Sequence, residues 1–333
     1  MHLVDLDADH PGFKDKAYRE RRDDIARAAK LRGQGGALQD VVYVEAEQDL
    51  WRRVRQELDP RHNEVACAEI LQAQSTLPLA IDRIPQFSEL NEQLSDATAF
   101  RLEPVAGLIR AREFLSGLAY GVFLATQYIR HHSKPFFTPE PDVVHELIGH
   151  AATLAHSGIA SLSRAFGEAA LEADEAGLAQ LENLYWYTLE YGLVREDGEI
   201  KILGAGLLSS VDDCDEYLTR PELREFDAEV AANMPYDPTD YQPVLFVADS
   251  FAEIERSCRE WFSLQSPEET PDLTLTGDYV EYITFMKRMA AGEVTPDQQP
   301  VTATGDENLM EKVGGVFAAG QKAATIGAEF PEL

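Results

Sequence analysis

Hydrophobic residues recur at helical spacing along most of the first half of the chain. Residues 14–32 are charged helix formers with a weak apolar face, which predicts a surface helix that ends at the glycines just after it. The apolar residues of 45–58 share one helical face. Residues 111–130 are apolar almost all round, which indicates a buried helix. Two more helices are expected in this half, at 62–76 and 87–97.

The second half mixes helices with short β-leaning runs. Residues 193–204 form two such runs around Asp197-Gly198, a dipeptide typical of hairpin turns. A short apolar strand is expected at 243–249, and helices at 159–176, 178–191 and 250–264. We therefore predict a mainly α (α+β) fold with a single helical domain and short strands. The expected division is an N-terminal helical arm at 1–40, the main domain at 41–285 and a loosely packed tail at 286–333.

Charge narrows the range of partners. The 333 residues include 59 acidic and 29 basic side chains, which gives a formal net charge of −30. Nucleic acid and anionic membrane surfaces are therefore poor partners. The acidic residues are spread along the chain, so we interpret them as a solvated surface. We hypothesise a salt-rich cytoplasm that screens their mutual repulsion.

The sequence favours a cytoplasmic location. No apolar run reaches the roughly 18 residues that a membrane-spanning helix needs, and residues 1–16 lack the pattern of a signal peptide. Cys67, Cys214 and Cys258 are an odd and scattered set. Such a set argues against a disulfide framework and fits a reducing compartment.

The stretch TPEPDVVHELIGH, residues 138–150, carries the first candidate chemistry. Its prolines delay the start of a helix, and Asp142 is placed to cap one. The helix then carries His145, Glu146 and His150. The histidines of a zinc-protease helix are four residues apart, whereas these are five apart, about 140° around a regular α-helix. Both can bind one ion only if the helix is irregular between them or if one of them lies at its end, and Gly149 makes such a distortion cheap.

The third ligand must come from elsewhere in the chain. Glu190 lies in the apolar block LENLYWYTLEYGL, where a carboxylate is costly to bury unless it is paired or bound to metal. Two histidines and one carboxylate suit non-haem Fe(II) and oxygen chemistry. The alternatives are ordinary core or surface histidines, and a Glu190 that pairs with Arg195 or faces solvent. A zinc-dependent hydrolase with Glu146 as base is a further alternative.

Two other features have both a functional and a structural interpretation. Arg130 follows the apolar run and could bind a carboxylate through two hydrogen bonds, or could simply interact with a helix dipole. In the segment GAGLLSS, residues 204–210, Ser209 or Ser210 could contact a ligand or cap a helix.

These blocks together resemble the pterin-dependent aromatic amino acid hydroxylases. TQYIRHHSKPFFTPEPDVVHELIGH, LYWYTLEYGL and GAGLLSS stand in that family's order and spacing, and the resemblance extends over about residues 10–262. It implies a mononuclear Fe(II), molecular oxygen and tetrahydrobiopterin or a related reduced pterin. The implied reaction is hydroxylation of free L-phenylalanine to L-tyrosine, with a dehydratase and a reductase that recycle the pterin.

The resemblance also implies a role for individual residues. The implied iron ligands are His145, His150 and Glu190. The implied pterin contacts are Gly107, Leu108, Ile109, Phe114 and Glu146. The implied substrate contacts are Arg130, with Asp142 behind it, and Thr138, Pro141, Trp186, Gly206 and Ser209. Tyr236 corresponds to a tyrosine on a loop over the pocket.

Departures from the family pattern leave the substrate open. Leu124, Tyr191 and Pro238 differ from it in or near the substrate pocket. Tryptophan as the substrate, or attack at the meta position of phenylalanine, therefore stays an alternative, and so does a pseudoenzyme that only binds. The tail lacks sustained heptads, so we expect a monomer or dimer without a tetramerisation coiled coil.

Overall fold

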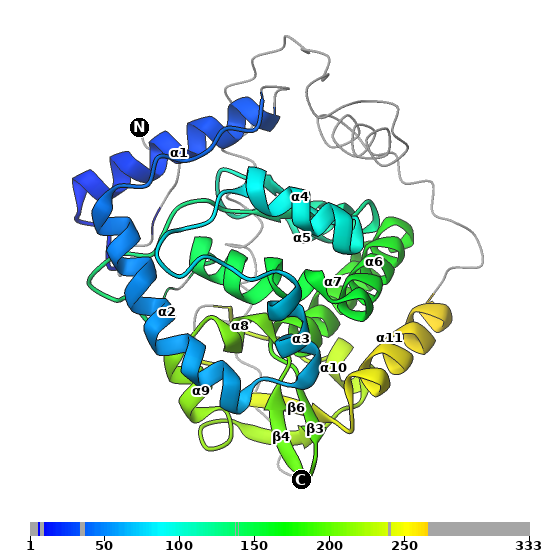
Figure 1. The fold of residues 1–333 in the computed structure, drawn as a ribbon. Helices are drawn as coiled ribbons and strands as arrows, with labels where there is room; N and C mark the ends of the chain where they lie inside the picture. Colours follow the sequence, from blue (N-terminus) through cyan, green and yellow to red (C-terminus); the bar gives the residue numbers. More distant parts are fainter. Residues whose placement is uncertain are drawn as a thin grey trace.

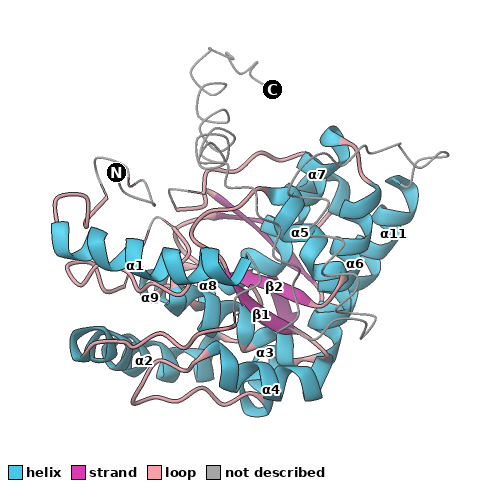
Figure 2. Cartoon of the chain, turned by 90° about the horizontal axis from the view of Figure 1, so that it is seen from above, coloured by secondary structure: helices cyan, strands magenta, loops and turns pink. Residues whose placement is uncertain are grey.

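The computed structural model describes residue 6 and residues 10–33, 37–136, 138, 140–238 and 241–265. Within these ranges most elements are helices, and the strands are short. Figure 1 shows α1 and α2 along one flank and α11 on the opposite side, while Figure 2 shows helices around the central strands. The predicted mainly helical α+β fold is confirmed. The predictions about the tail and its coiled coil concern residues outside the described ranges.

The first four helices follow the predicted pattern with one shift. They are α1 (Lys16–Gly33), α2 (Glu45–Val65), α3 (Ala68–Thr76) and α4 (Phe87–Thr98). The expected break before residue 62 is wrong, because α2 continues through Pro60. The chain breaks instead at Ala66 and Cys67, where the backbone N–H of Cys67 donates to the carbonyl of Ile202.

The expected buried helix at 111–130 is wrong over its second half. Helix α5 (Ala111–Ala119) ends early, and Gly121 turns the chain with a φ of +67°. The next residues form β2 (Val122–Ala125), which pairs in parallel with β1 (Arg101–Pro104). All four residues of β2 are buried. A strand buried on both faces has the same continuous apolar pattern as a buried helix, so periodicity could not separate the two.

The second sheet contains the predicted hairpin. Strands β3 (Leu193–Glu196) and β4 (Glu199–Ile202) are antiparallel, and both turn residues have positive φ, as expected of Asp197-Gly198. The strand order is β4-β3-β6-β5, with β6 (Val244–Ala248) parallel to both β3 and β5 (Glu222–Glu225). The hairpin and the 243–249 strand are therefore confirmed. β1, β2 and β5 were not predicted.

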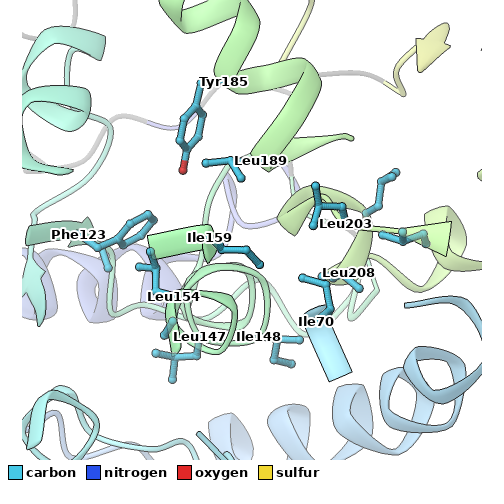
Figure 3. Close-up of a cluster of buried hydrophobic side chains, with 14 of the residues drawn as sticks. Ile70, Phe123, Leu147, Ile148, Leu154, Ile159, Tyr185, Leu189, Leu203 and Leu208 are labelled. Atoms are coloured by element: carbon cyan, nitrogen blue, oxygen red, sulfur yellow. The ribbon is translucent and has the colours of Figure 1, made fainter. Parts of the chain in front are cut away.

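The remaining elements surround the middle of the chain. They are η1 (His145–Ala151), η2 (Thr153–Ala155), α6 (Ser157–Glu172), α7 (Glu175–Tyr185), η3 (Trp186–Glu190), α8 (Ala205–Leu208), α9 (Val211–Glu216), α10 (Ala228–Ala232) and α11 (Phe251–Gln265). Figure 3 shows Leu147 and Ile148 of η1 within a cluster of buried apolar side chains, with Tyr185 above Phe123. Burial of this apolar surface holds η1 and η3 in the core. None of the helices described is long and apolar enough to cross a membrane.

Helix α1 is held to the body of the protein largely by buried charge. Arg22 is buried and forms two hydrogen bonds with the carboxylate of Glu140, at 2.6 and 3.0 Å. Its guanidinium also lies 3.6 Å from the ring centroid of Tyr128. His10 approaches the same carboxylate at 3.2 Å. The weak apolar face of α1 is thus supplemented by ion pairs that reach the loop before η1.

Candidate metal centre

The helix that carries the two histidines is irregular, as their spacing predicts. Residues His145–Ala151 form a π-helix, in which hydrogen bonds close over five residues instead of four. Residues five apart therefore lie above one another on the same face. The Nε2 atoms of His145 and His150 are 3.0 Å apart. Asp142 caps this helix as expected, because its Oδ1 accepts the backbone N–H of His145.

Glu190 completes a three-residue cluster from a second π-helix. It ends η3, and its two carboxylate oxygens lie 3.1 Å from Nε2 of His145 and 3.0 Å from Nε2 of His150. Burial alone would raise the pKa of Glu190, but the two imidazoles hold it well below its usual range. The alternative partner Arg195 pairs instead with Glu225, so that interpretation of Glu190 is wrong.

The spacing of these three residues fits a bound metal ion. One ligand atom from each lies within 4.8 Å of the ligand atoms of the other two. The two Nε2 atoms are 3.0 Å apart, and each lies 3.0–3.1 Å from a different carboxylate oxygen of Glu190, so the ligand atoms of the three residues face one another. This is the facial arrangement of two histidines and one carboxylate that suits Fe(II).

Ser209 sets the tautomer of His145. The Ser209 hydroxyl donates to the carbonyl of Gly206 at 3.1 Å, so its oxygen is free to accept. That oxygen lies 2.9 Å from Nδ1 of His145. The proton of the neutral imidazole therefore sits on Nδ1, and the lone pair of Nε2 points toward the cluster. The neighbouring Ser210 is the residue that caps a helix, since its hydroxyl accepts the N–H of Asp213.

Gly149 allows the serine segment to approach η1. A Cβ at this position would lie 2.7 Å from the carbonyl oxygen of Ala205 and 3.0 Å from its side chain. No side chain larger than hydrogen fits there without moving α8. Because Ser209 directly follows α8, the same close approach brings its hydroxyl to His145.

Arg130 lies beside the metal cluster and is paired with Asp142. Its Nε and Nη2 donate to the two carboxylate oxygens of Asp142 at 3.0 and 2.8 Å. Its Nη1 donates to the carbonyl of Ser209 at 3.4 Å, so three of its five N–H groups are used. Arg130 follows β2 in irregular backbone, so both its expected position at a helix end and the helix-dipole interpretation are wrong.

The other predicted substrate contacts differ in how they relate to the Arg130–Asp142 pair. Pro141 is adjacent to Asp142, and its carbonyl accepts the hydroxyl of Thr126. The hydroxyl of Thr138 donates to the carbonyl of Glu140, not to Arg130. Gly206 lies in α8 against the ring of Tyr191, to which a Cβ would approach within 2.6 Å. The structure thus brings Arg130, Asp142 and Ser209 into contact, whereas the hydroxyl of Thr138 forms its hydrogen bond within its own loop.

Three aromatic rings form a wall next to Glu190. The rings of Trp186 and Tyr236 are stacked with centroids 3.9 Å apart, and Tyr191 lies 4.7 Å from Trp186 on a tilted plane. The hydroxyl of Tyr236 donates to Glu182 at 2.8 Å, which fixes this ring on Trp186. Pro238, two residues further on, is exposed.

The predicted pterin contacts are linked to the metal cluster through aromatic rings. Phe114 packs edge-on against Phe123 at 5.3 Å, and Phe123 lies 4.6 Å from the ring of His150. Ile109 and Phe114 also pack against the buried pair Val122 and Leu124. Leu108 is 49% exposed, in the loop that continues from Gly107.

Glu146 of η1 is buried, and its carboxylate contacts Thr126, the residue that follows β2. Its Oε1 accepts the backbone N–H and the hydroxyl of Thr126, at 2.8 and 3.1 Å. Burial raises the pKa of Glu146 to about 7. A carboxyl group in this state can donate or accept a hydrogen bond near neutral pH.

Sequence reasoning missed three residues that position the site. Thr126 orients Glu146, and Phe123 packs on His150. The amide oxygen of Gln242 accepts the indole N–H of Trp186 at 3.0 Å. Thr126 lies in the block TQYIR and Gln242 in the block YQPVLF. Both blocks carry the family resemblance, so the resemblance was the signal that could have identified these two residues.

Comparison with known proteins agrees with this site. The family model of the biopterin-dependent aromatic amino acid hydroxylases matches residues 1–269. The chain therefore belongs to this family.

Relatives with different substrates match the chain about equally well. It is 42% identical over 263 residues to the phenylalanine-4-hydroxylase of Caenorhabditis elegans, a match that covers 78% of this chain and 58% of that protein. It is 43% identical over 277 residues to the tyrosine 3-monooxygenase of Bos taurus, covering 80% of this chain and 56% of the relative. The chain thus spans little more than half the length of these relatives.

Solved structures show the same fold. The phenylalanine hydroxylase of Chromobacterium violaceum, with bound iron(III) and 7,8-dihydrobiopterin, superposes with a TM-score of 0.65 at 30% identity, covering 72% of this chain and 92% of that one. The phenylalanine hydroxylase of Legionella pneumophila gives a TM-score of 0.62 at 28% identity, covering 74% and 92%. The predicted cofactors, iron and a biopterin, are confirmed by the family and by the His-His-Glu cluster.

Proposed function

We propose that this protein hydroxylates the aromatic ring of free L-phenylalanine to give L-tyrosine, with Fe(II), O2 and a reduced biopterin. The observation that carries the proposal is the connection between Arg130 and the metal cluster. Asp142 accepts from both Arg130 and the backbone of His145, and Ser209 contacts both side chains. A cation for an amino acid carboxylate is thereby held next to the metal ligands.

Different residues are proposed to bind the iron, the substrate carboxylate and the substrate ring. In our proposal His145, His150 and Glu190 hold the iron, which together with the reduced pterin activates O2 so that one oxygen atom enters the ring and the other leaves on the pterin. The two N–H groups that Arg130 does not use bind the substrate carboxylate. Trp186, Tyr191 and Tyr236 form an apolar wall for the substrate ring. Such positioning in a dry pocket is the protein's main contribution.

The pterin is proposed to bind between Phe114 and Glu146, on the opposite side of the iron from the substrate. Phe114 offers a ring for stacking, and the Gly107, Leu108 and Ile109 backbone lines the entrance. Glu146, with its pKa near neutrality, can hydrogen-bond a polar ring edge. Repeated turnover requires a dehydratase and a reductase that regenerate the pterin. The three buried free cysteines fit a reducing cytoplasm as the place of reaction.

A second candidate substrate is tyrosine. The 43% identity to tyrosine 3-monooxygenase differs by one percentage point from the 42% identity to phenylalanine-4-hydroxylase, so overall similarity does not separate the two. The pocket residues that could separate them are Leu124 and Tyr191. A zinc-dependent hydrolase finds no support in the family match.

Product analysis tests the proposal. The iron-loaded protein is supplied with O2, tetrahydrobiopterin and either phenylalanine, tyrosine or tryptophan, and the products are separated by chromatography. We expect para-tyrosine from phenylalanine, at a higher kcat/KM than any product from the other two acids. A dominant yield of 3,4-dihydroxyphenylalanine, meta-tyrosine or 5-hydroxytryptophan would replace phenylalanine 4-hydroxylation with the corresponding reaction.

A further inference from the structure

A second group of metal-ligating side chains lies outside the His-His-Glu cluster. Asp15 directly precedes α1, and His131 and His132 follow Arg130 in the loop after β2. One ligand atom from each of these three residues lies within 4.8 Å of the other two. Asp15 and His131 are 116 positions apart in the sequence, so the fold itself brings the group together.

The carboxylate of Asp15 is fixed in its orientation. Its Oδ1 accepts the backbone N–H of Tyr18 at 3.0 Å, which caps the first turn of α1. Its Oδ2 is turned to His131 and lies 3.3 Å from Nε2. The hydrogen bond from Tyr18 and the contact with His131 lower the pKa of Asp15, so the group is an anion at neutral pH.

His131 is also held in one orientation. Its Nδ1 lies 2.7 Å from the hydroxyl of Ser133, and the ring of Tyr18 packs edge-on against it at 5.0 Å. Nε2 therefore points to Asp15. Burial lowers the pKa of His131, which favours the neutral imidazole that metals bind. The ring of the exposed His132 lies 4.2 Å away, centroid to centroid, on the solvent side.

We propose that Asp15, His131 and His132 form a second metal site, which takes a borderline divalent cation such as Zn²⁺. Imidazole nitrogens with one carboxylate are ligands that Zn²⁺ accepts, whereas Mg²⁺ and Ca²⁺ prefer oxygen alone. On binding, the ion takes the place of the proton between Nε2 of His131 and Asp15, and in the neutral imidazole this proton moves to Nδ1, where the hydroxyl oxygen of Ser133 can accept it. Water completes the coordination on the exposed side of His132.

Metal binding at this proposed site would link two segments that are distant in the sequence. The ion would tether the segment before α1 to the loop that begins at Arg130. A ligand that binds only the folded chain raises its melting temperature by mass action. The proposal does not depend on the substrate or the reaction of the His-His-Glu cluster.

Simultaneous metal analysis tests the second site. The iron-loaded 333-residue protein is dialysed against micromolar Zn²⁺, and iron and zinc are measured in the same sample. We expect one zinc per chain in addition to the iron, and a higher melting temperature with zinc. In H132A and D15N the iron should remain while zinc binds at least about tenfold more weakly, the loss that even an outer contact to a metal site can cause.

The variants are chosen so that folding is retained. His132 is exposed, and asparagine at position 15 can still cap α1. H156A is the matched control, because His156 is a histidine at the start of α6, outside both groups, and this variant should bind zinc like the wild type. The proposal is overturned if the wild-type protein takes up no zinc, if zinc enters only as iron leaves, or if H132A and D15N bind zinc unchanged.

Discussion

The hydroxyl oxygen of Ser209 lies 2.9 Å from Nδ1 of His145, although the two residues are 64 positions apart. The same hydroxyl donates to the carbonyl of Gly206, which leaves its oxygen as the acceptor for His145. Ser209 was expected from the family resemblance to contact the substrate. The structure adds a hydrogen bond to His145, one of the proposed iron ligands.

Replacement of Ser209 by alanine should therefore weaken iron binding. Loss of an outer hydrogen bond to a ligating histidine typically costs about 10–100-fold in metal affinity. Competition with a chelator measures this. S210A is the control, because Ser210 caps α9 and should affect stability by about 0.5–2 kcal/mol but leave iron affinity unchanged. Equal iron affinity in S209A and the wild type would contradict the role given to Ser209.

Replacement of Gly149 by alanine should destabilise the protein. The new Cβ would meet the carbonyl of Ala205 at 2.7 Å, and such overpacking costs about 1–3 kcal/mol. Urea unfolding measures the difference. G177A is a matched control in α7, where the Cβ has ordinary contacts at 3.4 Å and the helix gains up to about 1 kcal/mol. If G149A unfolds at the same urea concentration as the wild type, the close approach of α8 and η1 is not as described.

The partly buried carboxylate of Glu140 should make stability depend on acid pH. Burial alone would raise its pKa, but the hydrogen bonds from His10 and Arg22 lower it from 4.5 to about 2. Its stabilising contribution is therefore complete above pH 4.5 and is lost as the pH falls toward 2. At about 1.4 kcal/mol for each pKa unit, this contribution is about 3 kcal/mol.

Comparison with E140Q isolates this contribution. Glutamine cannot titrate, and it leaves the buried charge of Arg22 without its anion, so E140Q should be less stable at neutral pH. The difference in unfolding free energy between wild type and E140Q should shrink by about 3 kcal/mol between pH 6 and pH 2. A difference that stays constant over this range would show that Glu140 does not carry the pH dependence.

The net charge of −30 predicts that salt stabilises the fold. Screening weakens both the general repulsion and the surface ion pairs, such as Arg195 with Glu225. Exposed pairs contribute little, typically below about 1 kcal/mol, so relief of the repulsion should dominate. The melting temperature should rise from dilute buffer to molar potassium chloride. A protein no more stable in molar salt would argue against a salt-rich cytoplasm.

The sequence predicted the parts of the site that depend on local spacing. Two histidines five apart can share an ion if the helix is irregular or if one of them lies at its end, and the π-helix over 145–151 is the first of these arrangements. The hairpin at Asp197-Gly198 likewise follows from local turn chemistry. By contrast, β2 has no periodicity that distinguishes it from a buried helix, and only Gly121 marked the break.

Contacts between distant segments could not be predicted in this way. The bond between Ser209 and His145 depends on how closely α8 packs on η1, and the pair of Arg22 with Glu140 joins positions 118 residues apart. The family resemblance named Ser209 as a site residue but not its partner. The domain boundaries and the roles of the individual site residues stay predictions.

The most direct test of the account is the loss of Glu190. In E190A the iron content and the pterin-dependent hydroxylation of phenylalanine should fall together, because the variant removes the only carboxylate of the cluster. E199A, on the exposed end of the hairpin, should retain both. Iron content and product formation are measured in the same preparation. Hydroxylation by E190A at the wild-type rate would contradict the assignment of His145, His150 and Glu190 as the iron site.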